Sequence, residues 1–273
     1  MTKKTMSLVA VLLLVLSLGL LPAAAETEEN TIYVNIANAG KLEAAMEPIA
    51  LADADGDGAL TVNDALILIH DAKYEGGAAA GFATADSQYG PMITKLWGVE
   101  NGGSYGYYVN NTMSMGLTDP VAAGDVVYAF VYADAAGFSD AYSYFDKSQA
   151  EIADGEELTL TLSKADGFDA NYAPIYKPLE GAVITVDGIA TQFVTDAEGK
   201  AVIKLESGPH IVSATAGETL LVPAVCAVAV QAAAAETSPA GYSSIFLISA
   251  ISEASVSRLS SGFSLRCSPV SSA

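Results

Sequence analysis

Apolar and polar positions alternate where the body of the chain begins, and a helical spacing follows about 30 residues later. The first alternating stretch predicts a strand, and its apolar side is made by Ile32, Val34 and Ile36. From residue 65 to 73 apolar side chains recur three or four positions apart, which predicts a helix. Gly76 and Gly77 follow and are typical of a helix stop. The two patterns together indicate mixed α and β structure.

A second group of alternating segments follows, separated by turn signals. Residues 126–132 place bulky and small apolar side chains on opposite sides, and three leucines share one side of residues 157–164. The pairs Asn101-Gly102 and Asn110-Asn111 are typical of turns between strands. We therefore predict an α+β module over residues 31–164, with several strands and one substantial helix.

The pattern changes again after residue 164. Two prolines interrupt residues 165–178, which predicts a linker or a lead-in strand. Residues 179–231 then read as short strands separated by turn signals such as Asp187-Gly188, at intervals of about ten residues. This spacing predicts a small all-β sandwich as the second module.

The two ends have compositions of their own. Residues 1–25 place two lysines before an apolar run and a small-residue stretch, the order of a secretory signal peptide. We expect a secreted, extracellular protein, free or associated with the cell surface, with no transmembrane domain beyond this segment. An uncleaved anchor is the alternative, although the run is shorter than the ~20 residues that span a bilayer. Residues 232–273 form a Ser-rich, low-complexity tail.

Charge narrows the choice of partner. From residue 26 to residue 236 the chain has 31 acidic residues, eight lysines and no arginine. Such a chain repels nucleic acid and anionic lipid, which makes both poor partners and favours cation binding. Only two cysteines occur, Cys226 and Cys267, so several disulfides cannot hold the fold together. The sequence leaves open whether these two cysteines pair.

The stretch DADGDGALTVND between the first strand and the helix has the spacing of a metal loop. Carboxylates occupy positions 1, 3 and 5, a glycine occupies position 6, and oxygen donors follow at positions 7, 9 and 12. The alternative is a solvated acidic turn that caps the helix. The six predicted calcium ligands are Asp53, Asp55, Asp57, Ala59, Thr61 and Asp64.

With the helix after it, this loop resembles an EF-hand and, in ending on aspartate, one repeat of a dockerin. Dockerins attach secreted enzymes to cohesin scaffolds and carry two such repeats. This resemblance implies calcium as the bound ion. It also implies an alternative function, as an accessory component of an extracellular polysaccharide-degrading system. A single loop favours a structural calcium site over docking.

Residues 88–164 resemble the transcobalamin-like C-terminal domain of secreted bacterial proteins. The resemblance lies in a Trp-Gly pair, a Tyr-Tyr-Val-Asn strand and a Gly-Asp turn before an aromatic strand. It implies a small, corrinoid-like ligand as one alternative. The aromatic rings could also stack on a sugar, or could simply fill the core. The candidate ligand-binding residues are Trp97, Tyr105, Tyr107 and Tyr108.

The second module resembles the prealbumin-like repeats of bacterial surface adhesins and the carboxypeptidase regulatory domain. A TDAEGKA turn and a Gly-x-His-x-Val step carry this resemblance, which implies a spacer. The two histidines, His70 and His210, lie far apart and match no catalytic or zinc spacing. We therefore expect a non-catalytic, calcium-binding protein of the adhesion or binding type. Its partner would be an extracellular protein, a glycan or a small ligand.

Overall fold

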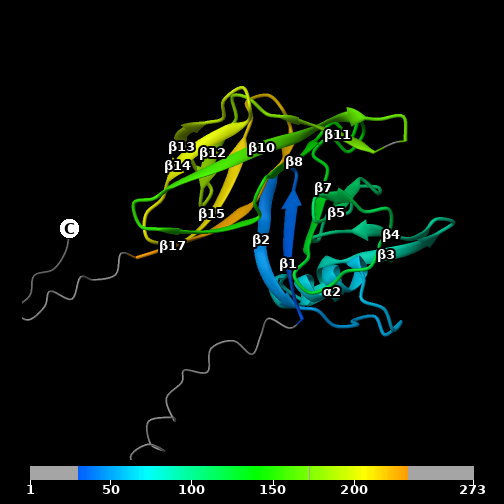
Figure 1. Ribbon diagram of the computed structural model, residues 1–273. Helices are drawn as coiled ribbons and strands as arrows, with labels where there is room; N and C mark the ends of the chain where they lie inside the picture. The colour runs from blue at the N-terminus through cyan, green and yellow to red at the C-terminus, as the bar shows by residue number, and fades with distance from the viewer. Residues whose placement is uncertain (1–29, 172, 233–273) are drawn as a thin grey trace, which may run out of the picture. The chain divides into compact units, whose positions relative to one another are not determined.

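The computed structural model describes residues 30–171 and 173–232, and most of this part of the chain is β-structure (Figure 1). The predicted signal peptide and the Ser-rich tail, with Cys267, lie outside the described residues. In the described part, no helix combines the length and the apolar character needed to cross a bilayer.

A five-stranded mixed sheet forms the first module. Its strand order is β2-β1-β7-β5-β6, and the two central strands run parallel while their other neighbours are antiparallel. The strands are β1 (Thr31–Asn38), β2 (Lys41–Ala50), β5 (Tyr105–Val109), β6 (Thr112–Met113) and β7 (Val126–Val131).

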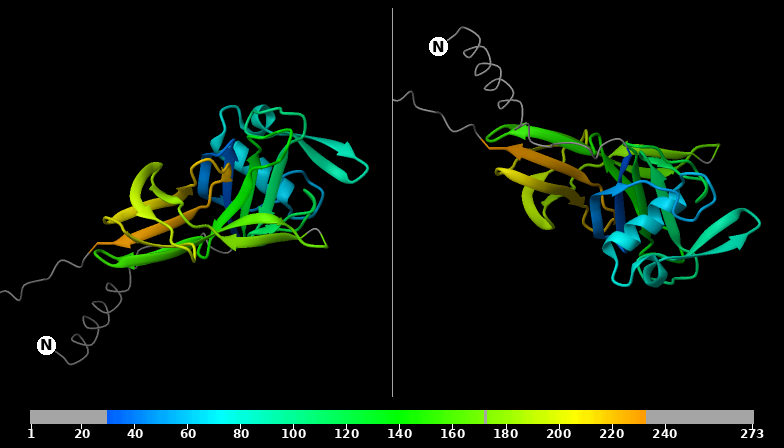
Figure 2. Two further views of the ribbon diagram at one scale, coloured as in Figure 1. Left: turned by 90° about the horizontal axis from the view of Figure 1, so that it is seen from above. Right: turned by 90° about the horizontal axis from the view of Figure 1, so that it is seen from below.

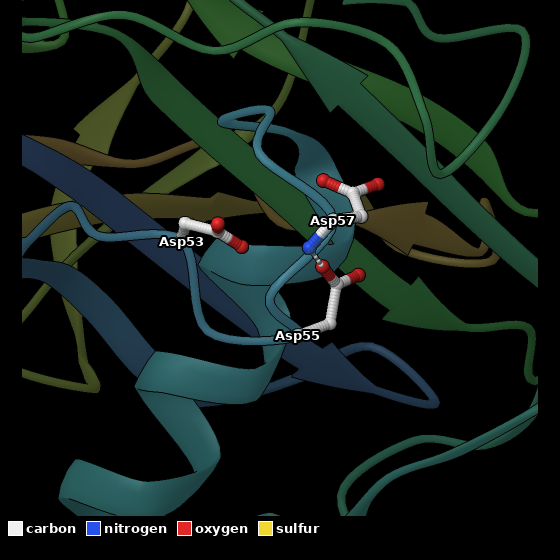
Figure 3. A group of neighbouring side chains, drawn as sticks. All are labelled: Asp53, Asp55 and Asp57. Carbon is white, nitrogen blue, oxygen red and sulfur yellow. Dashed lines mark hydrogen bonds between the residues drawn. The ribbon is translucent and has the colours of Figure 1, made fainter.

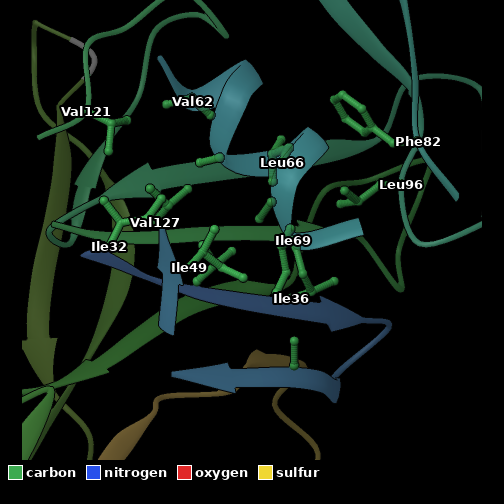
Figure 4. Close-up of a cluster of buried hydrophobic side chains, with 14 of the residues drawn as sticks. Ile32, Ile36, Ile49, Val62, Leu66, Ile69, Phe82, Leu96, Val121 and Val127 are labelled. Carbon is green, nitrogen blue, oxygen red and sulfur yellow. The ribbon is translucent and has the colours of Figure 1, made fainter. Parts of the chain in front are cut away.

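Helix α2 (Val62–Lys73) covers one face of this sheet and confirms the helix predicted from the apolar spacing (Figures 1 and 2). Its buried residues Leu66 and Ile69 pack with Ile36 in a core of aliphatic side chains (Figure 4). A short helix and a separate, mostly exposed two-stranded hairpin follow α2. They are α3 (Gly77–Gly81), β3 (Ala83–Ser87) and β4 (Gly90–Lys95).

The two central strands are buried on both faces, not on one as the alternation in β1 predicted. On β7, Val127 and Ala129 face the helix, whereas Tyr128 and Phe130 pack on the opposite face in a cluster rich in aromatic rings. A second module covers that opposite face. A sheet between two layers needs apolar side chains at successive positions, which explains the continuous apolar run.

The second module confirms the predicted β-sandwich. One sheet has the order β11-β10-β8-β16, with β14 also paired to β10, and the other has the order β13-β12-β15-β17-β9. Their inner faces share one apolar core. The first sheet contains β8 (Ala141–Phe145), β10 (Glu157–Phe168), β11 (Pro174–Pro178), β14 (Lys200–Lys204) and β16 (Leu221–Val222). The second contains β9 (Gln149–Ala153), β12 (Val183–Val186), β13 (Ile189–Val194), β15 (Gly208–Thr215) and β17 (Cys226–Gln231).

Strand pairing differs from the expected division at residue 164. Strand β10 pairs with β14, and β9 pairs with β17, so residues 141–164 belong by hydrogen bonding to the sandwich. The expected linker, residues 165–178, instead contains the end of β10 and the edge strand β11. Alternation in β10 correctly indicated a buried side, but alternation does not say which core receives it.

The two modules share a third cluster of buried side chains. The rings of Tyr108 and Tyr142 stack with centroids 3.7 Å apart, and the Tyr128 hydroxyl donates a 2.6 Å hydrogen bond to the Pro223 carbonyl oxygen. Tyr142 also donates to Asn111 Oδ1 over 2.9 Å. These contacts join strands of the first sheet to strands of the sandwich, which makes the junction a packed core.

Two turn predictions are confirmed by backbone geometry. Asn110 and Asn111 both have positive φ, and so do Asp187 and Gly188. Each pair joins two antiparallel strands in the two-residue turn that matches the twist of a hairpin. The remaining cysteine of the described chain, Cys226, is fully buried in the sandwich core.

Candidate metal loop and its surroundings

The predicted metal loop connects β2 to α2. Gly56 and Gly58 have φ values of 80° and 88°, a region that favours glycine. These turns fold the chain back on itself, so that Asp53 accepts hydrogen bonds from the backbone N–H groups of both glycines. The loop therefore has its sharp turn at Gly58, the glycine assigned to position 6.

Three of the predicted ligands come together at the surface. Carboxylate oxygens of Asp53, Asp55 and Asp57 lie within 4.8 Å of one another, and all three residues are exposed (Figure 3). The Asn63 amide nitrogen donates to Asp55 Oδ2 over 2.8 Å, a contact that the spacing of the loop residues does not predict. Like charges this close repel strongly, so a bound cation would lower the free energy of the loop.

Asp64 and Thr61 form hydrogen bonds within the loop and at the start of α2. Asp64 is completely buried, and its two oxygens accept from the backbone N–H groups of Ala54, Asp55 and Thr61 and from the Thr61 hydroxyl. Thr61 is the N-cap of α2 and forms a capping box with Asp64. The structure thus places both residues where they close the loop and cap the helix. This cap agrees with the alternative interpretation of the stretch, an acidic turn that caps the helix.

The donor set fits a hard cation such as Ca²⁺, which takes six to eight oxygen ligands. Asp53, Asp55 and Asp57 provide carboxylate oxygens, and Ala59 is exposed at the end of the same turn. The amide oxygen of Asn63 is buried without a hydrogen-bond partner in the described structure. All of these donors are oxygens, and none is the sulfur or imidazole nitrogen that zinc favours.

The four candidate aromatic residues do not form one surface. Trp97, Tyr105 and Tyr107 pack against the core under helix α2, while Tyr108 packs in the cluster between the modules. The Tyr105 hydroxyl donates to the carbonyl oxygens of Thr94 and Val99. This alternation across β5 follows from the strand pleat, and it separates rings that the sequence places side by side.

His70 is a buried link between α2 and the turn at Trp97. Its Nδ1 lies 2.6 Å from the Leu66 carbonyl oxygen, and its Nε2 accepts the Trp97 backbone N–H over 3.0 Å. A ring with one donor and one acceptor nitrogen is neutral. Burial lowers the pKa of His70 below its ordinary value, because a charged ring would lose its hydration.

His210 is in the opposite electrostatic situation. Its Nδ1 lies 2.8 Å from Asp187 Oδ2, and its Nε2 lies 3.0 Å from the Glu206 carbonyl oxygen. Both neighbours are acceptors, which favours the doubly protonated ring. The hydrogen bond to Asp187 accordingly raises the pKa of His210.

Comparisons with known proteins give little further guidance. No family model matches the chain, and no curated protein matches it. Among solved structures, the fibronectin(III)-like modules of Clostridium thermocellum CbhA match at 16% identity, over 55% of this chain and 76% of that chain, with a TM-score of 0.27. Such a likeness defines neither fold nor function. The class of the protein, two packed modules with a β-sandwich, rests on its own strand pairing.

Proposed function

We propose that this chain is a secreted or cell-surface, non-catalytic binding protein of the adhesion type, held in its working fold by one calcium ion. The observation that carries the proposal is the convergence of Asp53, Asp55 and Asp57 in a glycine-turned loop. Secretion is supported by the order of charged, apolar and small residues in positions 1–25. The spacer role of the sandwich is part of the proposal and is supported by the TDAEGKA turn and the Gly-x-His-x-Val step of its sequence.

The absence of catalysis is part of the proposal and is supported by how the two histidines and Cys226 are engaged. Both ring nitrogens of His70 and of His210 contact backbone or carboxylate groups. Burial raises the pKa of Cys226 to about 12, so its thiol stays protonated at neutral pH.

We expect calcium to act as a structural ion that stabilises the fold. Extracellular modules bind Ca²⁺ with Kd of roughly 10⁻⁴ to 10⁻³ M. At a free concentration of ~1 mM, such an affinity stabilises the fold by about 0.4 to 1.4 kcal/mol. That is useful to a fold without several disulfides and is too small for a sharp signalling switch.

Thermal melting with calcium and with EDTA tests the calcium site. We expect calcium to raise the Tm of the unaltered protein, and the double variant Asp53→Asn, Asp55→Asn to lose that rise. The matched control is Asp86→Asn with Asp154→Asn, which removes the same charge from exposed positions in β3 and after β9. A calcium shift that survives in the loop variant would place the ion elsewhere, and no shift in the unaltered protein would refute the site.

A further inference from the structure

A cleft of about 630 Å³ lies where the outer face of the sandwich meets β1 and β2. This volume falls in the range of small-molecule sites, ~300 to 1,000 Å³. None of its lining residues belongs to the metal loop. They come from segments distant in sequence, namely β1, β2, β9, β15, β17 and the turn at Asp187.

Strand register orders one wall of this cleft into two rows, because paired residues of neighbouring strands share a face. One row runs Ile211, Ala227, Gln149 across β15, β17 and β9. The other runs Pro209, Ala229, Glu151. In each row the residue on β15 is apolar, the residue on β17 is an alanine and the residue on β9 is polar. The two alanines leave the space that larger side chains would fill.

The facing wall is shaped by a bulge. Met46 has a positive φ of 49° at a register shift between β1 and β2, a conformation rare for residues other than glycine. Buried Asn35 holds it there, because its Oδ1 accepts the Met46 backbone N–H over 2.7 Å. Bulges redirect side chains, and strained residues cluster at binding sites.

The charge of the cleft selects its occupant. His210 Nδ1 lies 2.8 Å from the Asp187 carboxylate, which therefore already has a partner within the protein. The Glu151 carboxylate is exposed and has no hydrogen bond or ion pair among the described residues. The cleft thus has an apolar interior, a carboxylate at its polar edge that has no partner among the described residues, and a strongly acidic protein around it.

We propose that this cleft binds a small aromatic or aliphatic molecule that carries a positively charged amino group. The apolar part contacts Met46, Ile211 and the two alanines of β17, and the amino group lies toward Glu151. This site is separate from the calcium loop, so loss of calcium binding and loss of ligand binding can be measured independently.

Three fluorescent probes with one dansyl ring test the proposal. Dansylcadaverine is a cation, dansylamide is neutral and dansylglycine is an anion. We expect blue-shifted emission and the tightest binding with dansylcadaverine, weaker binding with dansylamide and the weakest with dansylglycine. Glu151→Gln should weaken dansylcadaverine binding about two- to fivefold and leave dansylamide unchanged, as for loss of an exposed ion pair.

Ala229→Trp fills the cleft and should abolish binding of all three probes. Glu75→Gln is the charge-matched control, because it follows α2 on the other side of the first sheet. Circular dichroism and Tm verify that each variant folds. The proposal is overturned by equal affinity for cation and anion, by full binding in Ala229→Trp, or by loss in Glu75→Gln. Self-association that Ala229→Trp abolishes would assign the cleft to a second copy and would also overturn it.

Discussion

His70 and Asp64 are the individual residues whose roles the local sequence conceals. Both lie on α2 and are fully buried, and each also contacts backbone groups outside the helix that the helical spacing does not predict. His70 accepts an N–H from Trp97, which is 27 positions away. Asp64 matches the twelfth loop position, yet its oxygens hold the loop backbone and the Thr61 cap. Residue type and spacing identify which side chains can bind an ion or form hydrogen bonds, whereas the tertiary fold decides which partner each of these buried acceptors meets.

His70 makes stability depend on pH in a defined direction. Its pKa in the folded protein is lowered by burial, so the unfolded chain binds the proton first. Stability is therefore fully present above about pH 6.5, the ordinary value, and is lost as the pH falls below it. We expect His70→Gln to remove this part of the pH dependence.

Urea denaturation from pH 7.5 to pH 5 measures the contribution of His70 to the pH dependence of stability. The difference in unfolding free energy between the unaltered protein and His70→Gln should be largest at pH 7.5 and should shrink on acidification. His210→Gln is the control with the opposite sign, because the hydrogen bond to Asp187 raises the pKa of His210. A His70→Gln difference that stays constant across this range would contradict the assignment.

At the scale of elements, the sequence identifies helix α2 and several hairpin turns with little ambiguity. The helix has its N-cap, its apolar spacing and its acidic first turn in one short segment. The turns at Asn110-Asn111 and Asp187-Gly188 use residues that tolerate positive φ. Strand partners cannot be identified in this way. Strand β9 pairs with β17, which begins more than 70 residues later. No local pattern specifies such a partner.

Thr61 allows the cap of α2 to be separated from calcium binding. Thr61→Ala should cost about 1 kcal/mol, the usual value of an N-cap hydroxyl. The loss should be the same in EDTA and in calcium, because the cap is already made within the protein. Thr61→Ser retains the hydroxyl and should lose only a few tenths of that amount. Urea denaturation in both buffers measures the effect, and a loss confined to calcium would assign Thr61 to the ion.

At the scale of the whole molecule, we expect the packed junction between the modules to govern how the protein unfolds. Tyr108, Tyr128 and Tyr142 are nearly fully buried there. A large apolar interface couples the two sides, whereas a flexible linker would leave them independent. The junction also brings β1 and β2 beside the outer face of the sandwich and so creates the cleft. The binding properties proposed for the protein therefore depend on this contact.

We expect the unaltered protein to unfold in one cooperative transition. Tyr142→Ala removes a buried ring that stacks on Tyr108, at a cost of about 3 to 5 kcal/mol. It should split the transition in two, whereas Tyr142→Phe keeps the ring and should retain a single transition. Scanning calorimetry measures this by comparing calorimetric and van't Hoff enthalpies. Two transitions in the unaltered protein, or one in Tyr142→Ala, would show that the junction does not couple the modules.

The sequence by itself determined the features that depend on neighbours along the chain. These are helix α2, the hairpin turns, the sandwich character of the second half, and the loop that gathers Asp53, Asp55 and Asp57. Tertiary structure alone decided that residues 141–164 pair with the sandwich, that the aromatic residues divide between two cores, and that a cleft forms at the junction. The physical reason is that turn and cap energies are local, whereas strand partners are chosen by which apolar faces can be buried together.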